Sequence, residues 1–271
     1  MTSRRALLAV LLVLAGAGCA ALRERFPGPD VLFVPTPEAV GVEMLKVAAV
    51  TAEDAVFDLG SGDGRVVIAA ARDFGARGVG IEIDPKLVAT SRDAAAAAGV
   101  GSRVTFLWQD LFATDLTGAT VVTLYLRDDV NLKLRPKLLR ELAPGTRVVS
   151  HDFDMGEWAP ERTYRVRGPD RQHRLYFWLI PARVAGAWHS RIGDGEGATL
   201  ALTQDFQNLT GTLLTGALRA LPVTGRLRGE RIELFAGGLT LRGVVNGEDI
   251  EGEVVEGSGA AQRWTARRAQ N

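Results

Sequence analysis

A glycine-rich turn led by an acid, from Asp58 to Arg65, is the stretch whose residue types and spacing could hold a small charged ligand. Its sequence is Asp-Leu-Gly-Ser-Gly-Asp-Gly-Arg. Glycines let the backbone turn tightly and let a ligand approach the main chain. A helix that follows such a turn offers N–H groups and the positive end of its dipole to an anion. The turn is therefore predicted to cradle a nucleotide-like ligand, with these residues in contact: Asp58, Gly60, Ser61, Gly62 and Gly64.

The spacing of this turn distinguishes between nucleotide classes. A dinucleotide fingerprint, G-x-G-x-x-G, would place its third glycine where this sequence has Arg65, and a pyrophosphate would be repelled by Asp58. An ordinary strand-turn-helix corner is the other alternative. The acid-led turn resembles the first motif of the class I S-adenosylmethionine-dependent methyltransferases, whose ligand carries a carboxylate and an ammonium. The resemblance implies S-adenosylmethionine as the cofactor.

Two further acids follow predicted strands. Glu82 comes about 20 residues after the turn, where an acid at a strand end can hydrogen-bond both ribose hydroxyls. By the resemblance, Asp110 would reach the adenine amino group. Their neighbours Ile83 and Leu111 are predicted to join them in the cofactor site. The alternatives are an exposed strand-end acid for Glu82 and a helix cap or turn residue for Asp110.

A closer resemblance rests on several motifs that occur together and in order. Besides the glycine turn these are Pro35-Thr36-Pro37, Gly80 to Asp84, Asn131 to Lys137 and Ser150 to Gly156. The set resembles bacterial relatives of the mitochondrial protein-lysine methyltransferases that modify the adenine nucleotide translocase and the c subunit of the ATP synthase. It spans residues 31–181 and implies a protein lysine as the substrate. The Asn-Pro-Pro-Tyr sequence of many amino-methylating enzymes is missing after the fourth strand.

The resemblance also gives Pro35 and Thr36 a place over the bound cofactor, the alternative being that Thr36 simply caps the helix that follows. A lysine nucleophile must lose its proton, against a reference pKa of about 10.4, and an apolar or aromatic channel favours the neutral amine. Residues at strand ends are predicted to build that channel: Tyr125, His151, Asp152 and Phe153. Strand packing for Tyr125 and a turn network for His151 and Asp152 are the alternatives.

The elements that must position these residues alternate between strand and helix. Predicted strands cover 56–57, 78–84, 104–108, 119–126, 147–150, 162–167 and 174–180. Predicted helices cover 39–49, 66–74, 85–98 and 128–142. This order predicts an α/β fold with a doubly wound, mainly parallel seven-stranded sheet that binds its ligand at the carboxyl ends of the strands. The last two strands would close it as an antiparallel pair.

From residue 184 onward, short alternating strands separated by glycines replace the helical patterns. Gly225-x-Leu-x-Gly229-x-x-Ile232 recurs as Gly243-x-Val-x-Gly247-x-x-Ile250, a weak repeat of hairpin units. The segment predicts a small antiparallel meander or barrel. The predicted domains are therefore an N-terminal segment 1–26, a methyltransferase domain 27–183 and a β domain 184–271.

The N-terminus has the layout of an export signal. Arg4-Arg5 precede the apolar run Ala6 to Ala15, and small residues lead to Cys19. A cysteine after small residues resembles a lipoprotein signal, which predicts membrane association and a place in the cell envelope. The two arginines also resemble a twin-arginine signal. An uncleaved anchor with the enzyme facing the cytoplasm is the alternative.

Composition narrows the partners. The 271 residues carry a formal net charge of zero, so no global field attracts nucleic acid. One cysteine allows no intrachain disulfide, and three histidines with one cysteine show no metal-ligand spacing, so no metal is expected. The sequence predicts a protein-lysine methyltransferase. A small-molecule methyltransferase, or an envelope lipoprotein that uses the fold only to bind, are the alternatives. The oligomeric state is left open.

Overall fold

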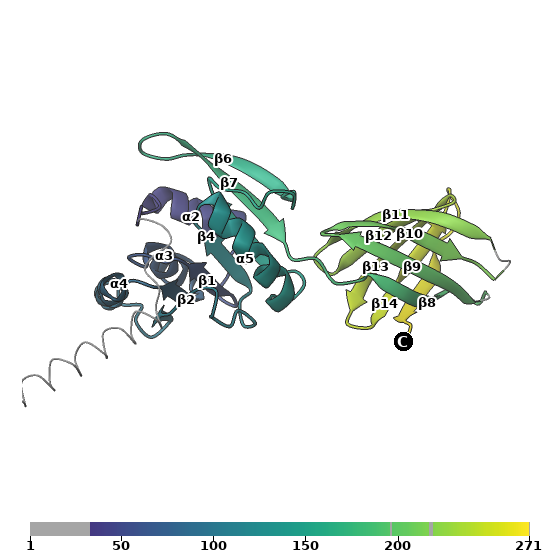
Figure 1. Cartoon of the computed structure of the whole chain (residues 1–271), viewed down its shortest axis with the longest axis horizontal. Helices are drawn as coiled ribbons and strands as arrows, with labels where there is room; N and C mark the ends of the chain where they lie inside the picture. The colour runs from purple at the N-terminus through teal and green to yellow at the C-terminus, as the bar shows by residue number, and fades with distance from the viewer. Residues whose placement is uncertain (1–32, 196, 217–218, 271) are drawn as a thin grey trace, which may run out of the picture.

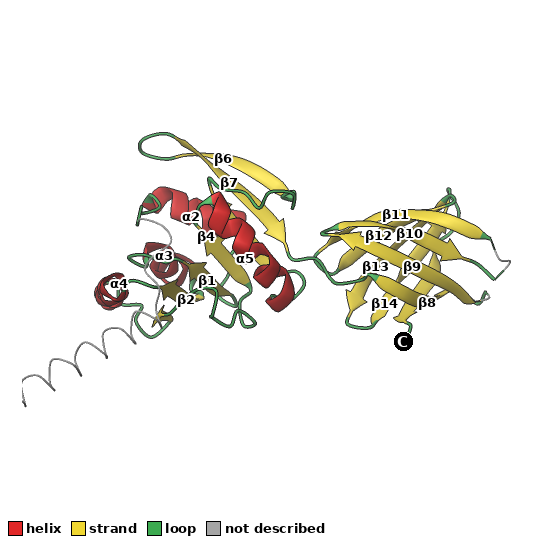
Figure 2. Cartoon of the chain, viewed as in Figure 1, coloured by secondary structure: helices red, strands yellow, loops and turns green. Residues whose placement is uncertain are grey.

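The computed structural model of the chain describes residues 33–195, 197–216 and 219–270. Mixed helices and strands run from α2 to β7, and strands alone follow from β8 to β15 (Figures 1 and 2). The predicted export signal with Cys19 lies outside the described residues. Within the described part, no helix combines the length and the apolar composition needed to cross a bilayer.

The first part is built on one seven-stranded sheet. Its strands are β1 (Ala55–Leu59), β2 (Arg77–Glu82), β3 (Val104–Trp108), β4 (Val121–Leu124), β5 (Arg147–His151), β6 (Arg162–Arg167) and β7 (Gln172–Leu179). They lie in the order β3-β2-β1-β4-β5-β7-β6. The first five are parallel, and β7 runs antiparallel to both β5 and β6. The predicted sheet, including its closing antiparallel pair, is confirmed.

Four helices cover the two faces of this sheet: α2 (Glu38–Val47), α3 (Arg65–Phe74), α4 (Pro85–Ala97) and α5 (Asp128–Glu141). Successive strand residues point to opposite faces. In β4, Val121 packs in one core with α2 and α3, while Val122 packs in another with α5. With both faces covered, ligands reach the sheet at the loops that follow the strands.

Helix α4 has a side-chain cap at its start and helix α2 has none. Asp84 is the N-cap of α4, where its side chain accepts a hydrogen bond from the N–H of Lys86 at 2.8 Å and Pro85 takes the first helical position. Thr36 does not cap α2, because Pro37 is the N-cap and no side chain bonds there. The cap prediction for Thr36 was wrong because its hydroxyl lies 3.2 Å from His151 Nδ1.

The second part is a closed barrel. Its strands are β8 (Gly186–Ile192), β9 (Gly197–Asp205), β10 (Asn208–Leu214), β11 (Ala220–Arg228), β12 (Arg231–Ala236), β13 (Leu239–Asn246), β14 (Asp249–Glu256) and β15 (Gln262–Arg268). Each pairs antiparallel with the next, and β15 closes the barrel by pairing with β8. Apolar side chains, among them the fully buried Trp188 and Trp264, form its core. The barrel alternative to a meander is confirmed.

A small set of contacts joins the two parts. Phe206, in the turn between β9 and β10, stacks on Trp158 with ring centroids 6.1 Å apart. The guanidinium of Arg135 on α5 lies 5.1 Å from the centroid of the same Phe206 ring. Glu161 pairs with Arg226 and Arg228 of β11. The barrel therefore rests against the end of the sheet that carries β7 (Figure 1).

Candidate active site

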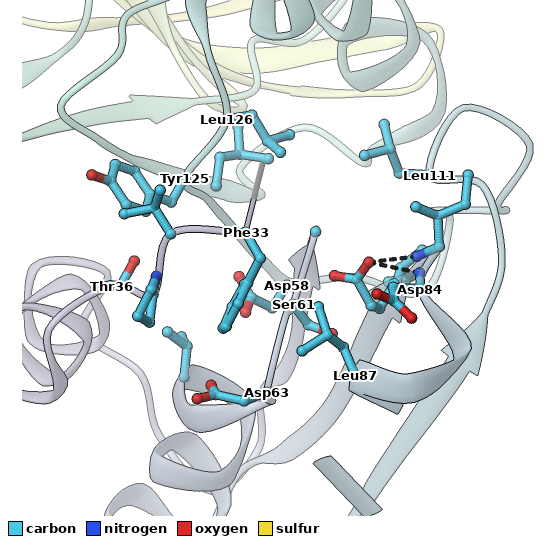
Figure 3. Close-up of a pocket in the computed structure, with 18 of the residues that line it drawn as sticks. Phe33, Thr36, Asp58, Ser61, Asp63, Asp84, Leu87, Leu111, Tyr125 and Leu126 are labelled. Carbon is cyan, nitrogen blue, oxygen red and sulfur yellow. Dashed lines mark hydrogen bonds between the residues drawn. The ribbon is translucent and has the colours of Figure 1, made fainter. Parts of the chain in front are cut away.

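A pocket lies where the carboxyl ends of β1, β2 and β4 meet the segment before α2. Nine residues predicted to bind the cofactor line it: Pro35, Thr36, Asp58, Gly60, Ser61, Glu82, Ile83, Asp110 and Leu111. Figure 3 shows Thr36 and Tyr125 at one end of the pocket and Asp84, Leu87 and Leu111 at the other. Gly62 and Gly64 shape the turn without lining the pocket. The pocket thus brings together segments that lie as far apart in the chain as Phe33 and Val130, as a strand-end site should.

The glycine turn needs its glycines for two separate reasons. Gly62 has φ +54°, and a Cβ atom there would lie 2.2 Å from Cε2 of Phe33, which covers the turn. Gly64 has φ +79° and is the N-cap of α3, where a Cβ would lie 2.6 Å from the Phe106 ring. A left-handed backbone costs a residue with a side chain about 1–2 kcal/mol. The turn can be built in this shape only with glycine.

Most of the turn's N–H groups are already occupied. Gly60 and Ser61 donate to the carbonyl of Ile81, Gly64 donates to the carbonyl of Ser61, and Gly62 donates to Glu82. The sequence predicted that N–H groups after the turn would meet the ligand's carboxylate. These four groups lie in the turn itself and fix its shape, so the N–H groups of the helix that follows stay the predicted partners of the carboxylate. Among the described residues that line the pocket, Arg65 is the one that carries a positive charge.

Glu82 points at the glycine turn. Its Oε2 accepts a hydrogen bond from the N–H of Gly62 at 2.9 Å, and its Oε1 accepts from Ile83 at 2.8 Å and Asp84 at 2.9 Å. A carboxylate has about four acceptor sites, so these bonds leave roughly one for a ligand hydroxyl. Glu82 therefore lies where the ribose prediction needs it, with room for one hydroxyl rather than two in this arrangement.

Asp58 is buried at the end of β1. Burial raises its pKa to about 7, and the nearby carboxylates of Glu82 and Asp63 push it the same way, against a hydrogen bond from Thr123 Oγ1 at 2.6 Å. A carboxyl in this state ionises readily once a cation arrives, because the opposite charge stabilises its anion. Asp58 is therefore poised to meet an ammonium group.

The charges around the pocket select the class of ligand. Five carboxyl side chains line it, those of Asp58, Asp63, Glu82, Asp84 and Asp110. Arg65 is held by Asp63, to which its Nε donates at 2.9 Å. Carboxylates attract a cationic ligand and repel a pyrophosphate. The Ser61 hydroxyl is buried and has no hydrogen-bond partner among the described residues, and a buried polar group without a partner points to one that a ligand supplies. S-adenosylmethionine, with a sulfonium, an ammonium and hydroxyls, fits this set.

Asp110 fits both predictions made for it. Its Oδ1 accepts a hydrogen bond from the N–H of Phe112 at 2.8 Å, which is a turn role. Its side chain also lines the pocket next to Leu111. A carboxylate can accept several hydrogen bonds, so the turn contact leaves acceptor capacity for a ligand amino group. The adenine role stays a prediction.

Tyr125 follows β4 and is the one predicted catalytic residue in the pocket wall. Its ring lies 3.9 Å from that of His151, stacked at 25°, and 6.0 Å from that of Phe153. Tyr125 and Phe153 are both partly exposed, while His151 is fully buried behind them. Of the three rings, Tyr125 is the one that lines the pocket, and the other two support it from behind. The aromatic ring of Tyr125 suits a substrate amine.

His151 and Asp152 belong to a network behind that wall. Asp152 sits at φ +61° and is held by Arg171 Nη2 at 2.5 Å and by the N–H of Arg174 at 2.8 Å. Its Oδ2 also lies 3.2 Å from Nδ1 of His173. Arg171 and these hydrogen bonds lower the pKa of Asp152 to about 2 although burial opposes them, so the carboxylate stays ionised. The predicted turn network is present, and neither residue lines the pocket.

Several residues of this region were not predicted from the sequence as site residues. They include Phe33, Asp63, Arg65 and Asp84 in the pocket wall and His173 in the network behind it. Asp63 and Arg65 lie inside the glycine motif, and their places in it were a usable signal. His173 is brought beside His151 because β7 pairs antiparallel with β5, with His151 opposite Leu175. The antiparallel pair of β6 and β7 was predicted, but the pairing of β7 with β5 and its register were not.

Comparison with known proteins gives consistent matches. Residues 58–162 match a family described as the ANTKMT methyltransferase domain. A protein-lysine N-methyltransferase of Saccharolobus islandicus is 42% identical over 153 residues, which is 56% of this chain and 95% of that relative. The adenine nucleotide translocase lysine N-methyltransferase of Mus musculus is 39% identical over 103 residues, which is 38% of this chain and only 45% of that relative.

A solved structure is also similar. It is described as an RNA methyltransferase from Salinibacter ruber in complex with S-adenosyl-L-homocysteine. It is 56% identical, has a TM-score of 0.53, and the match covers 56% of this chain and 96% of that one. Together with the family match, these similarities confirm the predicted resemblance and the predicted cofactor.

Proposed function

Because the chain belongs to the class I S-adenosylmethionine-dependent methyltransferases, in the ANTKMT methyltransferase family, we propose that it methylates the side-chain amine of a lysine in a protein. The observation that carries this proposal is the 42% identity across 95% of a relative named protein-lysine N-methyltransferase. The chain spans less than half of the mouse adenine nucleotide translocase enzyme, so a particular substrate does not follow from that relative.

The residues of the pocket divide the work of holding the donor. Asp58 would meet the ammonium, Arg65 the carboxylate, Glu82 a ribose hydroxyl and Asp110 the adenine amino group. When bound, S-adenosylmethionine supplies a methyl group on a positively charged sulfur. Transfer then depends on alignment and on exclusion of water. Phe33 and Pro35 line the pocket from the segment before α2 and would cover the bound donor there.

The aromatic end of the pocket suits the acceptor. Tyr125 lines the pocket, and the Phe153 ring lies beside the Tyr125 ring. An amine that enters next to them loses its contact with water. Loss of water disfavours the ammonium form and favours the neutral nucleophile. The faces of the same rings attract the methylated ammonium that forms, by cation–π interaction. This end of the pocket therefore supports an amine acceptor.

A second candidate function is methylation of RNA, since the similar Salinibacter structure is described as an RNA methyltransferase. One feature of this chain favours it. Arg165 and Arg174 are exposed and lie directly opposite each other on β6 and β7, and Arg167 shares their face of the hairpin. Such a face attracts phosphates, and it attracts an acidic protein surface equally well. The carboxyl-lined pocket and the net charge of zero favour the protein substrate.

One labelling experiment separates these functions. The full chain is incubated with methyl-labelled S-adenosylmethionine and a heat-treated cell extract, which is then divided into protein, RNA and small molecules. We expect label in methylated lysine after hydrolysis of the protein fraction. Label in RNA would establish the second function, and label in small molecules alone would contradict both. Glu82→Ala serves as the control and is expected to lose label in every fraction.

A further inference from the structure

Four side chains form a continuous line of hydrogen-bonding groups from the pocket wall to solvent. The Thr36 hydroxyl lies 3.2 Å from His151 Nδ1, and Thr36 lines the pocket. His151 Nε2 lies 2.8 Å from His173 Nδ1, and His173 Nε2 lies 3.3 Å from Asp170 Oδ1. Both rings are buried, at 0% and 2% exposure, whereas the Asp170 side chain is 63% exposed.

The line has a single direction when both rings are neutral and carry their proton on Nε2. His173 Nε2–H then donates to the Asp170 carboxylate, and His151 Nε2–H donates to the bare His173 Nδ1. The Thr36 O–H donates to the bare His151 Nδ1. Every donor on the line faces an acceptor, and every hydrogen bond of the line points away from the pocket. In this arrangement Asp152 Oδ2 shares the proton of His151 Nε2, 3.3 Å away, and its 3.2 Å contact with the bare His173 Nδ1 is not a hydrogen bond. An imidazole can take a proton on one nitrogen and release one from the other, which is what a relay needs.

We propose that Thr36, His151, His173 and Asp170 form a proton-transfer path that carries the proton of the substrate ammonium out of the closed pocket to solvent. The inference rests on the proposed function, because a lysine reaches the site protonated and must lose that proton before it can attack. Stacking of Tyr125 on His151 at 3.9 Å closes the direct route from pocket to ring. Thr36 is therefore the entrance to the path.

The step balances as a concerted shift. The ammonium gives one proton to Thr36 Oγ1 as Thr36 passes its own to His151 Nδ1. His151 passes its Nε2 proton to His173 Nδ1, and His173 passes its Nε2 proton to Asp170 and water. The neutral amine then forms the N–C bond while the C–S bond of the donor breaks and sulfur keeps the electron pair. After product release, a proton that runs inward along the same groups passes to water in the open pocket and from there to bulk solvent, which restores the starting arrangement.

The charged groups around the two rings suit this task. Burial lowers the pKa of His151 to about 4, so this ring passes a proton on and does not retain it. Asp152 faces both rings, with Oδ2 3.3 Å from His151 Nε2 and 3.2 Å from His173 Nδ1. The negative charge of Asp152 stabilises a proton that passes through the rings. Arg171, bound to the same oxygen at 2.5 Å, weakens this attraction, so the proton is not trapped there.

The same cluster has the composition of a metal site, since one ligand atom each from His151, Asp152 and His173 lie within 4.8 Å of one another. A metal ion would have to compete with the guanidinium of Arg171 for Asp152 Oδ2. Direct contact between His151 and His173 at 2.8 Å is also satisfied by one shared proton. These contacts favour the proton path, and the metal becomes an outcome of the test.

The first test is the pH dependence of methyl transfer by His173→Gln, with heat-treated extract protein as the acceptor, methyl-lysine as the product and the donor saturating. At about pH 7 we expect kcat to fall on the order of tenfold to a hundredfold, as for loss of a proton-transfer group. The loss should shrink toward about pH 9.5, where lysine more often arrives neutral. Thr36→Val should behave alike, and Thr36→Ser should restore the rate.

His189→Gln is the matched control, because His189 is the third histidine and is exposed on β8 of the barrel. It should leave the profile unchanged. An equal loss for His173→Gln at every pH would mean a structural role and overturn the proposal, as would full activity at pH 7. If wild type forms no methyl-lysine at all, the proposed function has failed instead.

The second test needs neither donor nor substrate. With ¹⁵N-labelled histidine the chain gives three pairs of imidazole nitrogen signals, which His173→Gln and His189→Gln assign by elimination. We expect neutral Nε2–H rings for His151 and His173 at about pH 7, with a coupling between His151 Nε2 and His173 Nδ1. Opposite tautomers in the donor-free protein would overturn the direction of the path. A stoichiometric metal whose removal by chelator stops methyl transfer would overturn the path itself.

Discussion

Glu82 has two tasks at the level of single residues, because the carboxylate predicted to hold the ribose also holds the glycine turn. Glu82→Ala removes the acceptor for three backbone N–H groups. A buried donor left without a partner costs about 1–3 kcal/mol. We expect a lower unfolding temperature and at least about a tenfold weaker affinity for S-adenosylmethionine, measured by thermal unfolding and calorimetry. Glu82→Gln, which keeps one oxygen, should lose less stability. Unchanged affinity in the alanine variant would contradict the ribose role.

Asp58 makes donor binding depend on pH. Its pKa is raised to about 7 by burial, and an ammonium beside it favours the carboxylate, so binding should release a proton. Affinity for S-adenosylmethionine should therefore rise as the pH is raised from roughly 6 to 8. Asp58→Asn should bind more weakly and with a flat profile over that range. Calorimetry in buffers of different ionisation enthalpy measures the proton count, and a wild-type count of zero would contradict this role.

The same residue affects stability with the opposite sign. Asp58 has a higher pKa in the fold than its ordinary value of 3.8, so the folded state binds more protons. The contribution of Asp58 to the stability of the fold is therefore complete below pH 3.8 and is lost as the pH rises through about 7. At pH 8 the donor-free Asp58→Asn protein should unfold at a higher temperature than wild type, and the difference should shrink at pH 5 and vanish only below about pH 3.8. An equal difference at both pH values would show that ionisation is not the cause.

Among the elements, the segment before α2 and the glycine turn act as one unit through Phe33 and Gly62. Gly62→Ala adds a Cβ 2.2 Å from the Phe33 ring at φ +54°. Gly99→Ala is the matched control, because Gly99 has φ +71° and nothing within 4 Å of the added Cβ. Both variants should lose about 1–2 kcal/mol of unfolding free energy from the left-handed backbone. Only Gly62→Ala should also weaken donor binding, and equal affinities would contradict a covering role for Phe33.

Most helices and strands could be predicted from local sequence patterns, but the closure of the barrel could not. The sheet was predicted because buried strands alternate with helices, and the hairpin repeat was predicted from its glycines. In the structure Gly229 and Gly247 occupy hairpin turns at φ +61° and +60°. The sequence did not decide between a barrel and a meander, because closure depends on the pairing of β15 with β8 across the whole domain. No local pattern encodes such a contact.

The site residues likewise fall into those that the sequence predicts and those that depend on contacts between distant strands. Asp58, Glu82 and Asp110 were predictable because each ends a parallel strand, and parallel strand ends meet at one edge. The line from Thr36 to Asp170 was not, since it depends on which side chains face each other across β5 and β7. A one-residue shift in that register would turn His173 to the opposite face.

For the whole molecule, the separate cores predict how it unfolds. The barrel core shares no residue with the cores of the sheet domain, and Phe206 is the barrel residue packed against one of them. Calorimetry should show two transitions. S-adenosylhomocysteine should raise only the one that belongs to the sheet domain, because a ligand stabilises the unit that binds it by RT ln(1 + [L]/Kd). A single transition that shifts as a whole would show that the two parts unfold together. Phe206→Ala should separate the two temperatures further.

Closure of the barrel by its first and last strands sets an order of events during translation. The sheet domain is complete at β7, which ends at Leu179, whereas β8 waits for a partner that ends at Arg268. At bacterial or eukaryotic rates of about 5–20 residues per second, this gap lasts several seconds. The nascent chain can thus present a finished catalytic domain to its donor while the ribosome still holds the strand that will seal the barrel.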